Sequence, residues 1–149
     1  MKKIEDEKNL DQKKILLRLD LNIPIQNGII TDSTRIDKIL PTLNHLLKYN
    51  CKIVIISHIG RPKGKVDVKL SMKPVSDYLS IKLNEKIKFI SEKIFEINLN
   101  VLFSDLKEKI LILENIRFYE GEEKNDKNFA ELLSKFGDIY VNDAFSCSH

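Results

Sequence analysis

Short apolar runs that alternate with helical periods constrain most strongly what this chain can fold into. The runs are rich in Ile and Val and contain few polar residues. Runs of this kind are typical of strands buried on both faces of a sheet, because a half-exposed strand would alternate apolar and polar residues. The sequence therefore predicts strands at 15–19, 52–56, 110–113 and 138–141, with a weaker one at 87–90.

Helical periodicity fills the segments between these runs. A stripe of Ile and Leu lies between 34 and 49, but Pro41 interrupts it. We expect a short turn at 34–39 and a regular helix that begins near Pro41, because proline is favoured in the first turn of a helix. Further helices are predicted at 73–83, within 92–106 and at 126–136, the last ending at Gly137. Strand alternating with helix predicts an α/β fold: a doubly wound, Rossmann-like parallel sheet in three layers, with right-handed crossovers.

Length and composition place the chain among soluble globular domains. Its 149 residues suit one domain, with 42% hydrophobic and 32% charged residues. No apolar run reaches the ~18 residues of a transmembrane helix, and the N-terminus has no apolar signal segment, so a cytoplasmic protein is expected. The net charge is only +3, and the basic residues are spread among acidic ones. This distribution gives nucleic-acid binding little support. Cys51 and Cys147 are too far apart in sequence to suggest a disulfide or zinc framework.

The last predicted strand is followed only by residues 142–149. A doubly wound sheet needs a further crossover helix to cover that part of the sheet. The sequence therefore predicts that 1–149 is a truncated domain.

Arginine is rare in this chain: only four of its 25 basic residues are arginines. The planar guanidinium group binds carboxylate and phosphate through two parallel hydrogen bonds, which the lysine ammonium cannot do. Ligands of open α/β sheets bind beyond the carboxyl ends of the strands. Arg61, Arg117 and His58 follow predicted strands, and Arg35 precedes the first helix. These residues predict an anion site with more than one positive charge.

Several candidate residues have a structural alternative. Asp20 and Asn22 are explained equally well by a turn before Pro24. His58 is equally consistent with a structural histidine. Arg18, inside a predicted strand, fits an edge or salt-bridge position better than a ligand position.

The basic loop at 60–65, Gly-Arg-Pro-Lys-Gly-Lys, is harder to explain structurally, because a glycine-bounded loop has little structural reason to carry this charge. It is not a P-loop, since it is one residue too short between its glycines and no Ser or Thr follows the lysine. GxGxxG, HExxH and a catalytic Ser, His and Asp set are also absent. The residues thus predict a polyanion pocket without a nucleotide cradle and without a metal site.

Eight segments, in their order and spacing, resemble the phosphoglycerate kinase family. They are RLDLNIP at 18–24, GIITDSTRI at 28–36, LPT at 40–42, SHIGRPKG at 57–64, SMKPV at 71–75, LENIRF at 113–118, GEEKN at 121–125 and YVNDAF at 140–145. So many ordered motifs make a chance match very improbable. The resemblance extends from about residue 15 to residue 149.

The resemblance implies a two-domain glycolytic kinase that transfers a phosphoryl group reversibly between ATP and 3-phosphoglycerate, giving 1,3-bisphosphoglycerate and ADP. This chain would be most of the N-terminal domain and would bind 3-phosphoglycerate. Mg-ATP or Mg-ADP would be bound by the absent C-terminal domain, so residues 1–149 would hold no cofactor or metal. The implied partner of this chain is the small molecule 3-phosphoglycerate, and neither nucleic acid nor membrane is implied. The full-length protein would be a monomer. The alternatives are a non-catalytic anion-binding fragment and, with less support, a basic nucleic-acid binder.

The resemblance also implies nine site residues. Asp20 and Asn22 would bind the glycerate end, His58, Arg61 and Arg117 the 3-phosphate, and the backbone of Leu21, Ile59 and Gly60 would line the pocket. Arg35 would be catalytic and would neutralise charge on the transferred phosphoryl group.

The C-terminal residues depart from the family pattern. The family usually continues Asp-Ala-Phe with Gly-Thr-Ala-His-Arg, whereas this chain continues with Ser146-Cys-Ser-His149 and ends. The next arginine, a further phosphate ligand in the family, is therefore missing. We expect the chain to be inactive by itself.

Overall fold

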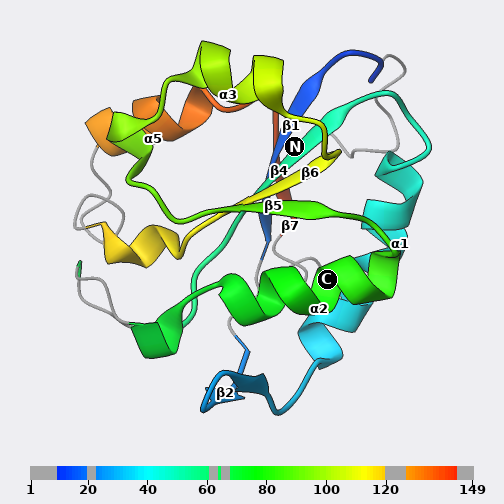
Figure 1. Cartoon of the computed structure of the whole chain (residues 1–149), viewed down its shortest axis with the longest axis vertical. Helices are drawn as coiled ribbons and strands as arrows, with labels where there is room; N and C mark the ends of the chain where they lie inside the picture. The colour runs from blue at the N-terminus through cyan, green and yellow to red at the C-terminus, as the bar shows by residue number, and fades with distance from the viewer. Residues whose placement is uncertain (1–9, 20–22, 61–63, 65–67, 120–126, 144–149) are drawn as a thin grey trace.

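The computed structural model describes residues 10–19, 23–60, 64, 68–119 and 127–143 (Figure 1). Within them, five parallel strands form one sheet in the order β5-β6-β4-β1-β7. The strands are β1 (Lys14–Leu19), β4 (Lys52–Ile56), β5 (Ile87–Ile90), β6 (Ile110–Leu113) and β7 (Ile139–Asp143). The five predicted strands and their parallel arrangement are confirmed.

One row of isoleucines crosses the whole sheet. Strand register aligns one isoleucine from each strand with its neighbours, in the spatial order Ile87, Ile110, Ile53, Ile15 and Ile139. The three central members are fully buried and the two outer ones partly buried. β-Branched side chains at directly adjacent positions pack well on a pleated surface. This row belongs to the larger of the two cores.

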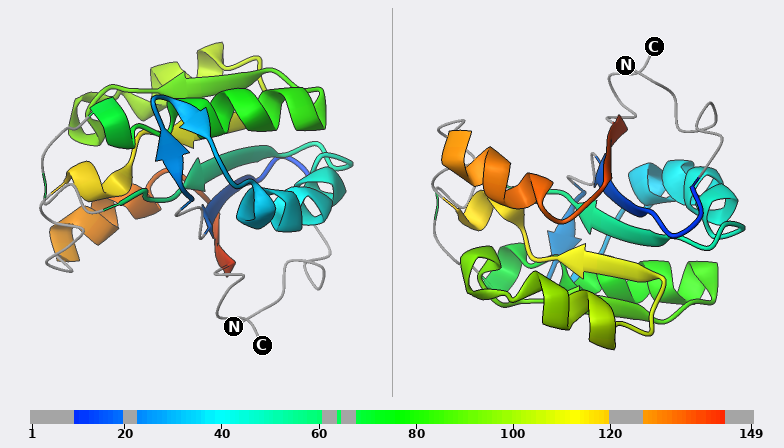
Figure 2. Two further views of the ribbon diagram at one scale, coloured as in Figure 1. Left: turned by 90° about the horizontal axis from the view of Figure 1, so that it is seen from below. Right: turned by 90° about the horizontal axis from the view of Figure 1, so that it is seen from above.

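Helices cover both faces of the sheet, as Figure 2 shows. The helices α1 (Thr34–Leu46) and α2 (Lys73–Leu83) pack on the face that carries Ile15 and Ile53. On the opposite face, Leu16 and Val54 pack with residues from α3 (Leu99–Asp105) and α5 (Lys127–Ser134). Because both faces are buried, the strands are apolar throughout, and the predicted three-layer α/β fold is confirmed.

The predicted start of the first helix is wrong. Helix α1 is continuous from Thr34 to Leu46 and contains Pro41 in its interior. Proline removes one backbone hydrogen bond from the helix. Pro41 is exposed, however, while the apolar stripe that begins at Ile36 is buried against the sheet. Burial of the stripe therefore outweighs the local cost of the proline.

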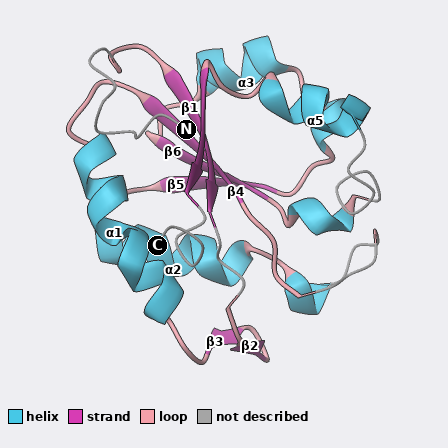
Figure 3. Ribbon diagram, turned by 180° about the vertical axis from the view of Figure 1, so that it is seen from behind, coloured by secondary structure: helices cyan, strands magenta, loops and turns pink. Residues whose placement is uncertain are grey.

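A two-stranded hairpin, absent from the sequence prediction, connects β1 with α1. It consists of β2 (Ile25–Gln26) and β3 (Ile29–Ile30), and Figure 3 shows it apart from the main sheet. Asn27 and Gly28 form its turn with φ angles of 52° and 76°. Asn-Gly is the strongest short-range hairpin signal, so the sequence did contain the information.

The predicted end of the last helix at Gly137 is wrong: α5 ends at Ser134, and Gly137 lies in the turn from α5 into β7 without a positive φ. A Cβ atom here would lie 2.7 Å from Leu16 Cβ and 2.8 Å from the Leu16 nitrogen. Glycine is thus needed because the backbone passes very close to β1.

Among the described residues, no helix has the length and apolar character needed to cross a membrane.

Candidate functional site

The carboxyl ends of the parallel strands meet at one edge of the sheet, where ligands of this fold class bind. The segment that follows β4 contains Ser57, His58 and Gly60, and the segment that follows β6 contains Glu114 and Asn115. Polar groups from two strands therefore gather where the sequence predicted the site.

Ser57 connects three of these strand ends. Its side chain is fully buried, and its hydroxyl donates a 2.7 Å hydrogen bond to the carbonyl of Leu19, the last residue of β1. Its own carbonyl accepts a 3.1 Å hydrogen bond from the Ile116 amide, which lies just beyond β6. The exits of β1, β4 and β6 are thus held together through one small residue.

Asn115 holds the backbone at two points, one before and one after the basic loop. Its side-chain amide nitrogen donates to the carbonyls of Ile59 and Leu70, each over 2.8 Å. Leu70 is the last residue of the short helix η2 (Val68–Leu70). Asn115 is fully buried, so these bonds also satisfy an amide that would be costly to bury alone.

Glu114 fixes the residues that follow the loop. One carboxylate oxygen accepts hydrogen bonds from the backbone amides of Met72 (2.7 Å) and Asn115 (2.8 Å), and the other accepts from the Ser71 hydroxyl (2.7 Å). Met72 directly precedes α2. A negative charge at this point also interacts favourably with the helix dipole.

Three of the predicted site residues lie at this edge and are described. His58 is half-buried and Ile59 is buried. Gly60 has a φ of 64°, a conformation that residues with a Cβ rarely adopt, and an added Cβ would lie 2.8 Å from Leu70 Cδ2. The backbone therefore turns at Gly60, two residues after His58, in a conformation that favours glycine.

Arg35 is the second residue of α1, and its side chain is exposed. The start of this helix is fixed by Asp32, whose carboxylate accepts bonds from the Thr34 amide (3.0 Å) and hydroxyl (2.6 Å). These bonds hold the pKa of Asp32 below its ordinary value. In the first turn of α1, Asp37 accepts a 2.8 Å bond from the Tyr78 hydroxyl of α2. The backbone that carries Arg35 is thus fixed at two points.

The remaining predicted site residues lie outside the described part of the chain. These are Asp20, Leu21, Asn22 and Arg61. The backbone of Arg117 lies in the short helix η4 (Ile116–Phe118), but its side chain is outside the description. The contacts proposed for these five residues therefore remain predictions.

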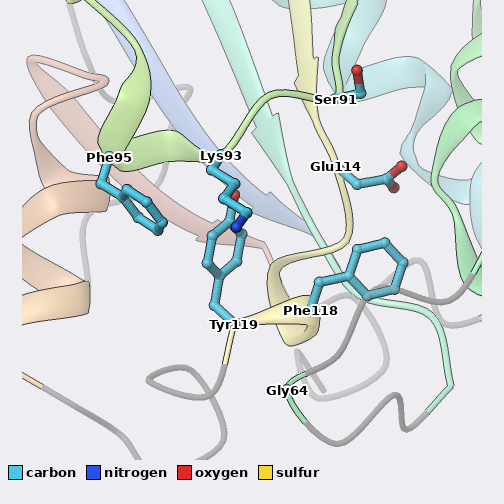
Figure 4. Close-up of a pocket in the computed structure, with 7 residues that line it drawn as sticks. All are labelled: Gly64, Ser91, Lys93, Phe95, Glu114, Phe118 and Tyr119. Carbon is cyan, nitrogen blue, oxygen red and sulfur yellow. The ribbon is translucent and has the colours of Figure 1, made fainter.

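A cavity of about 340 Å³, shown in Figure 4, was not foreseen from the sequence. It lies beyond the ends of β5 and β6 and is lined by Gly64, Ser91, Lys93, Phe95, Glu114, Phe118 and Tyr119. The sequence signal that could have indicated this cavity is the aromatic pair Phe118 and Tyr119, shortly after β6. Among the described residues that line it, Lys93 is the one basic residue and Glu114 the one carboxylate, and the oxygens of Glu114 are already bonded within the protein. The cavity is therefore less suited to a polyanion than the neighbouring strand exits.

No three His, Cys, Asp or Glu side chains gather as a metal site in the residues that the structure describes. Burial raises the pKa of Cys51, which is buried beneath α1. Cys147 is not described, so the predicted absence of a disulfide stays a prediction.

Comparisons with known proteins agree with this architecture. The family profile described as phosphoglycerate kinase matches residues 4–149. The phosphoglycerate kinases of Wolbachia sp. subsp. Drosophila simulans (strain wRi) and Orientia tsutsugamushi (strain Ikeda) are 51% and 50% identical to this chain, over 95% and 92% of its length. The aligned part is 35% and 34% of those relatives.

Solved structures give the same result. Phosphoglycerate kinase from Coxiella burnetii superposes with a TM-score of 0.81 at 33% identity, over 98% of this chain and 36% of that one. The enzyme from Pyrococcus horikoshii OT3 superposes with a TM-score of 0.82 at 32% identity, over 100% and 38%. The chain thus spans about a third of the length of its relatives. Sequence and fold together show that it belongs to the phosphoglycerate kinase family.

Proposed function

We propose that this chain is the 3-phosphoglycerate-binding part of a phosphoglycerate kinase, in which a phosphoryl group moves reversibly between ATP and 3-phosphoglycerate. The observation that carries the proposal is the segment Ser57–Gly60, which is held at the carboxyl edge of the sheet with His58 at its centre. Family membership supports the choice of substrate.

In this proposal the chain acts by positioning and by electrostatics. The 3-phosphate is bound by His58, Arg61 and Arg117, so that its charge is neutralised by groups from two strand exits. Asp20 and Asn22 orient the glycerate end of the substrate. Arg35 lies against the group being transferred, where a guanidinium stabilises negative charge that develops in the transition state. The bond that forms joins a substrate carboxylate oxygen to the phosphorus, and the bond that breaks joins that phosphorus to ADP.

The nucleotide is assigned to a different part of a longer protein. The described residues offer no cluster of acidic or imidazole ligands for Mg²⁺, and the sequence contains no phosphate-binding glycine motif. Residues 1–149 are therefore not proposed to bind Mg-ATP or Mg-ADP. We further propose that residues 1–149 are part of one domain and that the longer protein is cytoplasmic and monomeric, as the family resemblance implies.

Calorimetric titration of the chain with 3-phosphoglycerate tests the proposal. We expect binding of 3-phosphoglycerate, weaker binding of glycerate, which lacks the phosphate, no binding of ATP, and feeble binding of duplex DNA that disappears at moderate salt. H58Q should weaken 3-phosphoglycerate binding about 10-fold or more, because a charge-assisted hydrogen bond contributes about 1.5–3 kcal/mol.

His45 provides the matched control, since it lies in the last turn of α1 rather than at a strand exit. H45Q should bind 3-phosphoglycerate as the parent does. Equal affinities for 3-phosphoglycerate and glycerate would contradict the proposed phosphate site. ATP-dependent turnover by 1–149 would contradict the assignment of the nucleotide to another part of the protein.

A further inference from the structure

The first turn of α1, which carries Arg35, is bonded through Asp37 to the residue that precedes the helix. The Ser33 hydroxyl donates a 2.9 Å hydrogen bond to the Asp37 carboxylate, and the Ser33 carbonyl accepts a 2.9 Å bond from the Asp37 amide. Arg35 lies midway between these two residues in the sequence, and its side chain is exposed. The position of its guanidinium group therefore depends on where the backbone of this turn lies.

The second oxygen of the Asp37 carboxylate bonds to a different helix. It accepts the 2.8 Å hydrogen bond from the Tyr78 hydroxyl of α2, 41 positions later in the chain. The Tyr78 ring is half-buried and packs against the larger core. Tyr78 thus joins an apolar ring that is fixed by packing to a polar group at the surface.

Helix α2 is itself fixed at its start and along one face. The Met72 amide, directly before the helix, donates a 2.7 Å bond to Glu114 at the end of β6. Val75 and Leu79 are fully buried in the core that contains the isoleucine row of the sheet. The bond from Tyr78 therefore connects the first turn of α1 to an element whose position is set by the sheet.

Placement of Arg35 matters because misplacement of a catalytic group by about 1 Å can lower a rate roughly 100-fold. We propose that Tyr78 and Asp37 are positioning residues that hold the first turn of α1 in the orientation in which Arg35 meets the transferred phosphoryl group. They act through the backbone and do not touch the substrate. The inference rests on the proposed function for the role of Arg35, whereas the hold on the first turn can be measured without any ligand.

The test compares the binding of two ligands to the chain 1–149. One is 3-phosphoglycerate, and the other is a phosphonate analogue of 1,3-bisphosphoglycerate in which a methylene group replaces the oxygen between the carbonyl carbon and the phosphorus. The analogue carries the group that Arg35 is proposed to meet, so we expect the parent to prefer it and R35A to lose most of this preference. Y78F should lower the preference about 3- to 10-fold, the effect of one hydrogen bond, and leave 3-phosphoglycerate affinity unchanged.

A double-mutant cycle separates positioning from general stability. If Tyr78 acts on the ligand through Arg35, adding Y78F to R35A should produce no further change in the preference. A merely structural role would lower both affinities together, with or without Arg35. D37N is the conservative variant: it keeps an oxygen that accepts from the Tyr78 hydroxyl, so it should retain the preference, whereas D37A should behave like Y78F.

Amide hydrogen exchange measures the hold on the helix directly. Y78F should accelerate exchange at the Asp37 amide, which bonds to the Ser33 carbonyl, and leave exchange unchanged at the Leu47 amide, which bonds at the other end of α1. Y49F is the matched control, because Tyr49 is also a half-buried tyrosine packed on the larger core but follows the C-terminal end of α1. Y49F should match the parent in exchange at Asp37 and in both affinities.

Each other outcome decides the inference. A folded Y78F with the preference of the parent, or with exchange that is unchanged at Asp37 or equally faster at Leu47, overturns it, as does a further effect of Y78F in R35A. If Y78F does not fold, D37A is judged by the same measurements. If the parent binds neither ligand, or R35A keeps the preference, the role proposed for Arg35 fails, and the exchange data alone decide whether Tyr78 holds the first turn of α1.

Discussion

Arg35 is the residue whose proposed role is most specific to catalysis. In a hybrid enzyme in which 1–149 replaces the matching third of a relative, we expect R35A to lower kcat by about 10³- to 10⁵-fold, with a smaller change in KM for 3-phosphoglycerate. R35K should also be poor, because an ammonium group cannot reproduce the planar guanidinium contacts. Steady-state kinetics check this, with K48A at the exposed Lys48 as the control. A kcat for R35A within a few-fold of the parent would contradict the role.

Gly137 lies in the turn between α5 and β7, and the close packing of this turn against β1 depends on this one residue. G137A should destabilise the chain by about 1–3 kcal/mol, because the new Cβ would overlap Leu16 at 2.7 Å and the backbone offers no room to move. Urea denaturation measures the loss. S134A, at an exposed position in α5, should change the free energy of unfolding by about 0.5 kcal/mol or less. Equal midpoints for G137A and the parent would show that the close approach is relaxed at little cost.

At the scale of elements, the Tyr119 hydroxyl connects the end of η4 to the short helix η3 (Ile94–Glu96). It accepts a 2.9 Å bond from the Ile94 amide, and burial raises the pKa of this phenol above its ordinary value near 10. A raised folded-state pKa favours the protonated form. The associated stability is therefore complete below pH 10 and is lost as the pH rises through the folded-state pKa.

The corresponding experiment compares the free energy of unfolding with pH for the parent and Y119F. We expect the difference in unfolding free energy between the parent and Y119F to be constant up to about pH 9.5 and to shrink at higher pH. The reason is that the Tyr119 phenol ionises at a lower pH in the unfolded parent than in the folded parent. Y140F, which alters an exposed phenol on β7, is the control. A difference that does not change between pH 8 and 11 would argue against the burial of Tyr119.

Much of the element structure was predictable from the sequence, and the exceptions have physical reasons. The strands were found because two buried faces leave unbroken apolar runs. The start of α1 was misplaced because Pro41 has a strong local preference, while the burial of Ile36 that overrides it depends on the sheet. The hairpin at Asn27 was overlooked although its turn signal was present.

The candidate site was predictable only in part. His58, Ile59 and Gly60 were placed at the correct edge, because the carboxyl end of a parallel strand is set by chain direction. The anchoring roles of Glu114 and Asn115 were missed, since their partners lie 42 to 56 positions earlier in the chain. Hydrogen bonds over such separations leave no periodic pattern in the sequence.

At the scale of the whole molecule, the two outer strands of the sheet differ in how their open edges are protected. In β5 an exposed lysine, Lys88, discourages pairing with another chain. The strand β7 presents Tyr140, which is 55% exposed, and pairs only with β1 among the described residues. We predict that 1–149 associates through β7 as its concentration increases.

Sedimentation velocity over a range of concentrations measures this association. Y140K should reduce it, because a lysine on an edge strand opposes pairing. The same substitution at Ile81, an exposed residue of α2, is the matched control and should have no effect. A parent chain that remains monomeric at high concentration would show that the β7 edge is protected in another way.

The position of β1 in the interior of the sheet also has a consequence during synthesis. The Lys14 amide donates to the Asp138 carboxylate, a partner 124 positions later in the chain. At a translation rate of about 5–20 residues per second, the ribosome needs roughly 6–25 s to produce that partner after β1 has been made. Until then, β4 is the only neighbouring strand of the described sheet that can pair with β1, and it pairs at one edge of β1. The newly made chain therefore exposes an apolar, hydrogen-bonding strand to other nascent chains and to chaperones until β7 has emerged.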